Sequence, residues 1–261
     1  MISGSTRIIP IIGHPVAQVV SPPAFNGAFA KEGMDSAMIP LDVPREALAA
    51  FWTLLRASPN MTGCSVTYPH KRAAFDAVDS HTSRAARLGA LNTVRCDAGH
   101  LTGDATDGVA MCAAIAASGL TVTGRSALIL GAGGGAGIAI VDALCENGIR
   151  SLSLVETHAE RLATLQSFLT KNWAGVEVDF ELKPADIVIN ATTLGKNDTD
   201  DSPFPEPVLA EAAMICDVVT HRTGTRLSRE ALARNIPFVS GEDMGRGQVA
   251  AQRKFWGSDS P

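Results

Sequence analysis

Short apolar runs alternate with stretches of helical spacing along almost the whole chain. In the first half, the apolar runs predict strands over 7–12, 36–43 and 63–69, and two more strands within 91–106 around a turn at Ala98-Gly99. Helical spacing predicts one helix over 44–57, with Pro44 suited to its first turn, and another over 107–119 that ends at a glycine. The first half is therefore expected to be an α/β domain.

The alternation becomes more regular after Arg125. Apolar runs predict strands over 126–132, 151–156, 176–181, 185–192 and 212–219, with helices over 135–148 and 158–172. Continuous apolar runs are typical of strands buried on both faces, and the helices between them indicate right-handed parallel crossovers. We therefore expect a doubly wound, Rossmann-type α/β domain in the second half, with the domain boundary between residues 104 and 125.

Composition and charge narrow the class of protein. The chain has 261 residues, enough for two modest domains, and a formal net charge of -5 without a long basic run, which argues against a nucleic-acid or anionic-membrane partner. No apolar stretch approaches the roughly 20 residues that span a bilayer, and the N-terminus lacks the apolar core of a signal peptide. We expect a cytoplasmic protein, as a monomer or a homodimer.

The five cysteines show no metal-ligand or disulfide spacing. They are scattered along the chain, at Cys64, Cys96, Cys112, Cys145 and Cys216. No C-x-x-C pair or Cys/His cluster is present, so we expect reduced, buried thiols and no structural metal.

A glycine-rich turn follows the predicted strand 126–132. Gly131, Gly133 and Ala136 fit the dinucleotide-binding pattern G-x-G-x-x-G/A, and Gly134 and Gly135 complete the turn. Gly131 permits a tight turn, Gly133 lets the backbone approach a pyrophosphate, and Ala136 is small enough for the helix to pack close to the sheet. The helix N-terminus offers N–H groups to phosphates. A glycine-rich turn without a ligand is the alternative.

The next predicted strand ends at Glu156, 25 positions after Gly131. A carboxylate there accepts hydrogen bonds from the ribose hydroxyls of NAD and repels the 2′-phosphate of NADP. We therefore predict NAD as the preferred cofactor, while His158 and Arg161 just beyond keep NADP open. An acid exposed to solvent on a loop is the alternative for Glu156.

Several further motifs occur in a fixed order. They are "GHPVAQVVSPPAFNGAF" (13–29), "SVTYPHK" (65–71), "LGALNTV" (88–94), "GDATDG" (103–108), "GAGGGAG" (131–137), "INATTLG" (189–195), "DVVTHRTGTRL" (217–227) and "GEDMGRGQVAAQRKFWG" (241–257). Together they resemble the shikimate/quinate dehydrogenase family from about residue 8 to residue 257. The resemblance implies a substrate-binding and catalytic domain over 1–104, completed by a helix within 240–261, and a Rossmann NAD(P)-binding domain over 105–239.

The resemblance also implies a catalytic lysine and aspartate, which match Lys71 in "VTYPHK" and Asp107 in "ATDG". Oxidation of a secondary alcohol requires a base for the hydroxyl proton while hydride leaves the carbon. A lysine serves as that base when desolvation lowers its pKa. A nearby carboxylate acts in the opposite direction, so we treat the two residues as one coupled unit in which Asp107 orients the hydroxyl or shares its proton. Considered singly, Lys71 fits a solvated helix start and Asp107 fits an N-cap.

Further site residues follow from the resemblance. It implies that Thr67, Asn92 and Gln248 bind substrate hydroxyls and that Ser21 binds the substrate carboxylate. Gln248 is preferred to Gln252 because Met244 and Trp256 then fall at the family spacings. The other matches are Ser65 and Thr220 on the substrate side, and Thr192 and Gly241 on the cofactor side. Local backbone bonds explain Thr67 and Ser21 equally well, as an exposed helix face does Gln248.

The sequence departs from the family pattern mainly on the substrate side. Compared with the family pattern, Val19 stands in place of a serine, Gln18 and Phe25 in place of histidines, Ser65 and Ala105 in place of asparagines, and Thr220 in place of a tyrosine. One lost hydrogen bond to a carboxylate costs roughly 1.5–3 kcal/mol. We therefore expect a dehydrogenase, with a place in aromatic amino acid biosynthesis implied by the family, whose preferred substrate is quinate or a related hydroxylated ring or polyol acid. The alternatives are a dinucleotide-binding sensor with little turnover and a different Rossmann reductase.

Overall fold

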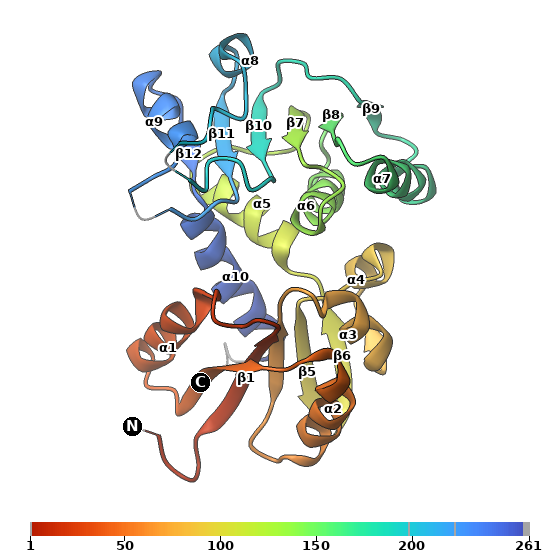
Figure 1. Cartoon of the computed structure of the whole chain (residues 1–261), viewed down its shortest axis with the longest axis vertical. Helices are drawn as coiled ribbons and strands as arrows, with labels where there is room; N and C mark the ends of the chain where they lie inside the picture. Colours follow the sequence, from red (N-terminus) through yellow and green to blue (C-terminus); the bar gives the residue numbers. More distant parts are fainter. Residues whose placement is uncertain (1, 198, 222, 258–261) are drawn as a thin grey trace. The chain divides into compact units, whose positions relative to one another are not determined.

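The computed structural model describes residues 2–197, 199–221 and 223–257 and divides the chain into two compact units. Unit 1 comprises residues 1–106 and 248–261, and unit 2 comprises residues 107–247. Each unit is built on one six-stranded sheet. Figure 1 shows the chain passing between the units twice, once after β6 and once within α10.

Unit 1 has a mixed sheet with the strand order β2-β1-β3-β5-β6-β4. Its strands are β1 (Arg7–Gly13), β2 (Ser36–Asp42), β3 (Gly63–Val66), β4 (Ser80–His81), β5 (Thr93–Asp97) and β6 (His100–Asp104). The pairs β1–β2, β1–β3 and β4–β6 are parallel, whereas β3–β5 and β5–β6 are antiparallel. The predicted turn of the β5–β6 hairpin is confirmed, because Ala98 and Gly99 both adopt positive φ, as a two-residue hairpin of this type requires.

The helices of unit 1 cover both faces of this sheet. They are α1 (Ser21–Lys31), the 3₁₀ turn η1 (Arg45–Ala47), α2 (Leu48–Ala57), α3 (Lys71–Ala77), α4 (Ser83–Leu88) and the end of α10 (Gly241–Phe255). Alternation along β1 places Ile9 and Ile11 in a cluster with α1 and Trp256, and Ile12 in a cluster with α2. The predicted helix 44–57 therefore forms as η1 followed by α2, with Pro44 at the N-cap of η1.

Unit 2 has an all-parallel sheet with the strand order β12-β11-β10-β7-β8-β9. Its strands are β7 (Ser126–Leu130), β8 (Ser151–Val155), β9 (Glu177–Asp179), β10 (Ile187–Asn190), β11 (Met214–Asp217) and β12 (Phe238–Val239). Its helices are α5 (Asp107–Ala117), α6 (Gly135–Glu146), α7 (Ala159–Asn172), α8 (Glu206–Ala210), α9 (Arg226–Ala233) and the first part of α10. The predicted Rossmann-type architecture is confirmed.

Close backbone contacts hold three helices of unit 2 together. A Cβ placed on Gly108 of α5 would lie 1.9 Å from the carbonyl oxygen of Ala139 on α6. A Cβ on Gly247 of α10 would lie 2.6 Å from the carbonyl oxygen of Ala110 on α5. Only glycine fits at both contacts, so the glycine that follows Asp107 lets α5 pack directly against α6.

Several short elements have no clear periodic signal. The strands β4 and β12 have two residues each, and β9 spans fewer residues than the predicted strand 176–181. The helices α3, α4, α8 and α9 lie where the pattern alone predicts no helix, because stretches this short bury only a few apolar side chains. The longer helix α1 was also not predicted from the pattern, and among its residues only Pro22, Phe25 and Phe29 are buried.

The five cysteines are free thiols, four of them buried and Cys96 half-buried. Burial raises the pKa of the Cys112 thiol to about 12 and also raises the pKa of Cys64 and Cys216. Within the described residues, no group of three His, Cys, Asp or Glu side chains is arranged to hold a metal ion. No described helix combines the length and the apolar character needed to cross a membrane.

Candidate functional site

The glycine-rich turn of unit 2 joins the end of β7 to α6. Gly131 has a φ of +79°, and a Cβ there would lie 2.7 Å from the side chain of Thr192, so glycine is required for the turn. The tightest approach is at Gly137, one residue beyond Ala136, where a Cβ would lie 2.1 Å from the carbonyl oxygen of Gly131. The sequence pattern did not single out Gly137. Its position as the seventh residue of "GAGGGAG" was the available signal.

Glu156 contacts this turn directly. It follows β8, accepts a hydrogen bond from the backbone N–H of Gly133 at 3.2 Å through Oε2, and accepts one from the N–H of His158 at 2.9 Å through Oε1. A Cβ on Gly133 would lie 2.9 Å from Cβ of Arg161 and 3.0 Å from Oε2 of Glu156. The carboxylate is therefore oriented by two backbone donors beside the turn, with Arg161 adjacent.

The position of the turn in the sheet fits a dinucleotide. The strands β7 and β10 are neighbours, and the order reverses between them, since β8 and β9 lie on one side and β11 and β12 on the other. Ligands of open parallel sheets bind at such a switch point, beyond the carboxyl ends of the strands. At the start of α6, a Cβ on Gly135 would meet no heavy atom within 4 Å, so this end of the turn is open and its backbone N–H groups suit a pyrophosphate.

The loops after β10 and β11 lie at the same edge of the sheet. Thr192 donates to Oδ1 of Asn190 from both its backbone N–H, at 3.1 Å, and its hydroxyl, at 2.6 Å. Thr220 is exposed, and a Cβ on Gly241 would lie 2.8 Å from its Oγ1. The candidate residues Thr192 and Thr220 therefore belong to carboxyl-end loops of unit 2, and Gly241, the first residue of α10, lies against the loop after β11.

In unit 1, the segment after β3 carries Thr67 and Lys71. The backbone N–H of Thr67 donates to the carbonyl of Ile12 at 2.9 Å, so this segment extends beside the end of β1. Lys71 is the first residue of α3 and is half-buried, and its carbonyl accepts from the N–H of Leu91 at 3.0 Å. That bond ties the start of α3 to the segment that carries Asn92.

The side chain of His70 anchors the segment that carries Thr67 and Lys71 to the residue that follows β2. It is buried, and its Nε2–H donates to the carbonyl oxygen of Val43 at 2.6 Å. Because a carbonyl only accepts, this bond assigns a proton to Nε2. His70 was not singled out from the sequence, since a histidine beside Lys71 carries no periodic or spacing signal of its own.

The side chain of Asn92 is oriented by a buried polar cluster. Its Oδ1 accepts from the backbone N–H of Thr106 at 2.8 Å, from the hydroxyl of Thr106 at 3.0 Å and from the hydroxyl of Thr93 at 3.0 Å. Three donors on Oδ1 assign the other end of the amide as Nδ2, which is a donor. The Nδ2 end of the Asn92 side chain is therefore the donor end, on the side away from Thr93 and Thr106.

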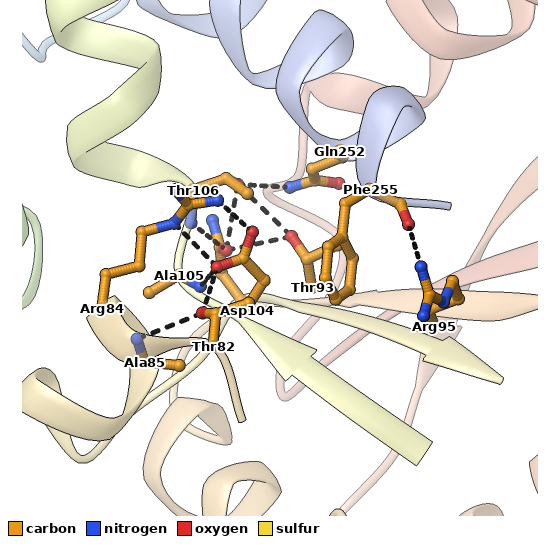
Figure 2. Close-up of polar contacts among 11 residues, drawn as sticks. Thr82, Arg84, Ala85, Thr93, Arg95, Asp104, Ala105, Thr106, Gln252 and Phe255 are labelled. Atoms are coloured by element: carbon orange, nitrogen blue, oxygen red, sulfur yellow. Dashed lines mark hydrogen bonds and ion pairs between the residues drawn. The ribbon is translucent and has the colours of Figure 1, made fainter. Parts of the chain in front are cut away.

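Gln252 of α10 reaches this cluster, although the sequence pattern favoured Gln248. Its Nε2 lies 3.5 Å from Oγ1 of Thr106, as Figure 2 shows, and the residue is 2 % exposed. Among the described residues, Oε1 of Gln252 is one of three buried side-chain polar atoms without a hydrogen-bond partner. Gln248 is half-buried in the same helix.

Asp104 and Asp107 flank Thr106 and differ in their surroundings. Asp104 is fully buried and accepts hydrogen bonds from Thr82 and from Arg84, so it holds α4 to the end of β6 (Figure 2). Asp107 is 7 % exposed and is the first residue of α5. A carboxylate at a helix N-terminus is stabilised there by the helix dipole.

Ser21 is half-buried at the first position of α1. Two residues earlier, Val19 packs against the apolar cluster that contains Phe25 and Trp256. The position of Val19 is therefore an apolar one.

Near the end of β1, Nδ1–H of His14 donates a hydrogen bond to Asp42 at 2.6 Å. This bond lowers the pKa of the Asp42 carboxyl below its usual value.

Comparison with known proteins decides the family. Residues 11–94 match the family model described as the shikimate dehydrogenase substrate binding domain. The chain is 39% identical over 269 aligned residues to a shikimate dehydrogenase (NADP(+)) of Rubrobacter xylanophilus, covering 99% of this chain and 93% of the relative. The chain belongs to the shikimate dehydrogenase family.

Solved structures agree with this assignment. A crystal structure of shikimate 5-dehydrogenase from Listeria monocytogenes, in complex with shikimate and NAD, is 26% identical with a TM-score of 0.89, over 99% of this chain and 94% of that one. A shikimate 5-dehydrogenase from Thermus thermophilus, in complex with NADP(H) and shikimate, is 28% identical with a TM-score of 0.85, over 98% and 95%. The shikimate dehydrogenase family comprises oxidoreductases that use a nicotinamide dinucleotide, and both cofactors occur among these relatives.

Proposed function

We propose that this protein is an NAD(P)-dependent dehydrogenase that acts on a secondary alcohol of a shikimate- or quinate-like hydroxylated acid. The observation that carries the proposal is the glycine turn at the switch point of unit 2, where Gly131, Gly133 and Gly137 allow close packing of the turn and the start of α6 at Gly135 stays open to a pyrophosphate. Unit 2 is then the cofactor-binding unit, and unit 1 is the substrate-binding unit, in which Asn92, Thr67 and Ser21 are the candidate substrate contacts.

In the proposed chemistry, residues of this chain transfer the proton of the substrate hydroxyl. Lys71 takes the proton of the substrate hydroxyl, and Asp107 orients that hydroxyl, as one acid–base unit. Asn92 donates from Nδ2 to the substrate, because three donors already occupy its Oδ1. A bound nicotinamide supplies the hydride acceptor for the alcohol, or the hydride donor for the ketone. In the reverse reaction Lys71 returns the proton.

We further propose that NAD is preferred to NADP, although the curated relatives are named for NADP(+). The carboxylate of Glu156 is oriented by the backbone donors of Gly133 and His158 beside the glycine turn. A negative charge in that place favours two ribose hydroxyls over a phosphate. Arg161 stands beside Gly133 and is the residue that opposes this preference.

The substrate preference proposed here excludes shikimate as the best substrate. Val19 occupies a position that the family fills with a serine, and it packs against the apolar cluster of α1, so it offers no hydrogen bond to a carboxylate. The polar residue Ser65 is buried, 5 % exposed, with its hydroxyl 3.4 Å from the carbonyl oxygen of Asn92. The substrate side of unit 1 is therefore poorer in donors than the family pattern.

Steady-state kinetics test these proposals together. kcat/KM is measured for shikimate, quinate and a panel of hydroxylated ring and polyol acids, each with NAD and with NADP. We expect the highest value for a substrate other than shikimate, with NAD. High efficiency on shikimate with NADP contradicts both preferences while leaving the dehydrogenase proposal intact.

The second candidate function is a dinucleotide-binding sensor, which is favoured by the replacement of a substrate-binding serine by Val19. The same kinetic panel separates the sensor from the dehydrogenase. A sensor binds NADH, seen by its fluorescence, and turns over no member of the panel. Turnover of any member above about 1 s⁻¹, within the usual range of enzymes, supports the dehydrogenase.

A further inference from the structure

We propose that Asp217 is a positioning residue that holds the two loops of unit 2 flanking the nicotinamide half of the cofactor site. The inference rests on the proposed function, because it concerns how unit 2 prepares the dinucleotide site. Asp217 is the last residue of β11, is fully buried, and was not singled out in the sequence beyond its place in a motif.

Three donors from different segments converge on the Asp217 carboxylate. Oδ1 accepts from Nδ2 of Asn190 at 3.0 Å and from the backbone N–H of Val219 at 3.0 Å. Oδ2 accepts from the hydroxyl of Thr225 at 2.8 Å. The carboxylate therefore joins the end of β10, the loop after β11 and the start of α9, where Thr225 is the N-cap residue.

Asn190 passes this constraint to the loop after β10. It is fully buried, and its Nδ2 also donates to the carbonyl of Leu194 at 3.0 Å. Its Oδ1 accepts from the N–H and hydroxyl of Thr192. A Cβ on Gly131 would lie 3.0 Å from the carbonyl oxygen of Ala191, so this loop rests against the glycine turn.

The network lies beside the switch point. Asn190 ends β10, the direct neighbour of β7, and Asp217 ends β11, the next strand. In a doubly wound sheet the half that carries the glycine turn binds the adenosine part, and the other half binds the second nucleotide. The loops that Asp217 and Asn190 hold therefore face the nicotinamide nucleotide.

A carboxylate suits this role because it only accepts. The N–H of Val219 and Nδ2 of Asn190 only donate, and the Thr225 hydroxyl donates to Oδ2 while it accepts from the N–H of Ser228. An amide in place of Asp217 would therefore direct an N–H either at these donors or at the Thr225 hydroxyl, which would have to give up its own bond to the side chain. Burial raises the pKa of Asp217, and the bonds from Val219, Thr225 and Asn190 oppose that rise. Loops ordered before binding lose less conformational freedom when the ligand arrives, which strengthens binding.

The main test compares Asp217→Asn with Asp186→Asn. Asp186 lies at the other end of β10, where it accepts from the N–H and hydroxyl of Ser126 at 2.8 and 2.9 Å, and is therefore a matched control for a carboxylate that holds the same sheet. Kd for NADH is measured by fluorescence, together with KM for the cofactor, KM for the substrate, kcat and Tm. We expect Asp217→Asn to raise Kd and KM for the cofactor about tenfold, the equivalent of 1.4 kcal/mol, with little change in KM for the substrate.

A second pair of variants covers the case in which Asp217→Asn does not fold. Thr225→Val removes one donor from the carboxylate, and Thr225→Ser keeps the hydroxyl. We expect the valine variant to weaken NADH binding and the serine variant to restore it to within about twofold, a difference of roughly 0.4 kcal/mol.

Three outcomes overturn the inference. Equal Kd for NADH in the wild type and Asp217→Asn contradicts it, as does an equal weakening in Asp186→Asn, which would reveal a general loss of stability. Equal Kd in Thr225→Val and Thr225→Ser contradicts it as well. Failure of the wild-type chain to bind either dinucleotide is a different result, since it contradicts the proposed function itself.

Discussion

The two sheets of this protein differ in the direction of their strands and in how their candidate sites are built. The sheet of unit 2 is entirely parallel, and its candidate site is built from backbone: a glycine turn, strand ends and the start of α6. The sheet of unit 1 mixes parallel and antiparallel pairs, and its candidate site consists of side chains at strand and helix ends, such as Thr67, Lys71 and Asn92. Backbone recognition suits a phosphate, which every dinucleotide shares, whereas side chains suit the substrate, which differs between enzymes.

The same contrast holds for the polar groups inside each unit. In unit 2 the buried Asp217 and Asn190 have their bonding atoms occupied by donors and acceptors of neighbouring loops. In unit 1 the cluster around Asn92 is similar, but Oε1 of Gln252 is buried without a partner among the described residues. Four predictions test this difference between the two units.

The largest effect is expected for Lys71→Ala. Loss of the proposed base is expected to lower kcat by about 10²–10⁴-fold, while Kd for NADH stays unchanged because the proposed cofactor contacts belong to unit 2. Steady-state kinetics and NADH fluorescence measure the two quantities. Lys183→Ala, which removes an exposed lysine of unit 2 that pairs with Asp179 and Glu181, is the control and should keep full activity. Unchanged kcat in Lys71→Ala removes this residue from the chemistry.

The second effect concerns backbone packing in unit 2. Gly108→Ala introduces a Cβ 1.9 Å from the carbonyl oxygen of Ala139, so we expect α5 and α6 to separate at a cost of about 1–3 kcal/mol. Gly135→Ala, where a Cβ meets nothing within 4 Å, should be neutral or slightly stabilising. Urea unfolding measures both. Equal stability of the two variants would show that close backbone contact is unimportant here.

The third effect concerns the polar cluster of unit 1. Thr106→Val removes the hydroxyl that donates to Asn92, and we expect a loss of about 1 kcal/mol in the free energy of unfolding, which Thr106→Ser should recover. Gln252→Met removes the unpartnered Oε1 and should cost less than about 0.5 kcal/mol, because a buried polar atom without a partner is itself unfavourable. A larger loss in Gln252→Met than in Thr106→Val would reverse this ranking.

The smallest effect is expected for Asp79→Asn, whose difference in Tm from the wild type should disappear in strong acid. The Arg56 guanidinium and the N–H of Leu101 lower the pKa of Asp79 to about 2. A lowered folded-state pKa contributes stability above the ordinary pKa of the carboxyl, and that contribution is lost as the pH falls through about 2. Asp79→Asn should therefore lower Tm at neutral pH by a small amount and have no effect below pH 2. A wild-type Tm that stays above that of Asp79→Asn at pH 1.5 would contradict this assignment.

The sequence was most informative where structure repeats. The periodicity from Arg125 onward predicted the parallel strands β7, β8, β10 and β11, and the glycines marked the turn between β7 and α6. The motif order predicted the family, which the relatives confirm. Lys71, Asp107 and the other assigned site residues remain predictions about chemistry.

Other parts of the site carried no local pattern. Gly137, which the G-x-G-x-x-G/A pattern does not include, lies so close to the turn that a Cβ there would meet the carbonyl oxygen of Gly131 at 2.1 Å. Gln252 reaches Thr106 across more than 140 positions of sequence, and Asn190 meets Asp217 across 27. Such contacts depend on which strands are neighbours, and strand order is a property of the whole sheet.

The amino-acid sequence was enough to predict the two α/β halves, the glycine-rich turn and the family, because apolar periodicity, glycine requirements and motif order are all local features of the chain. The folded structure was needed to establish which end of the Asn92 amide donates, how Glu156 is held against Gly133 and where Asp217 finds its three donors. Hydrogen bonds are directional and short, so their partners are settled only when distant segments are brought within about 3 Å of one another.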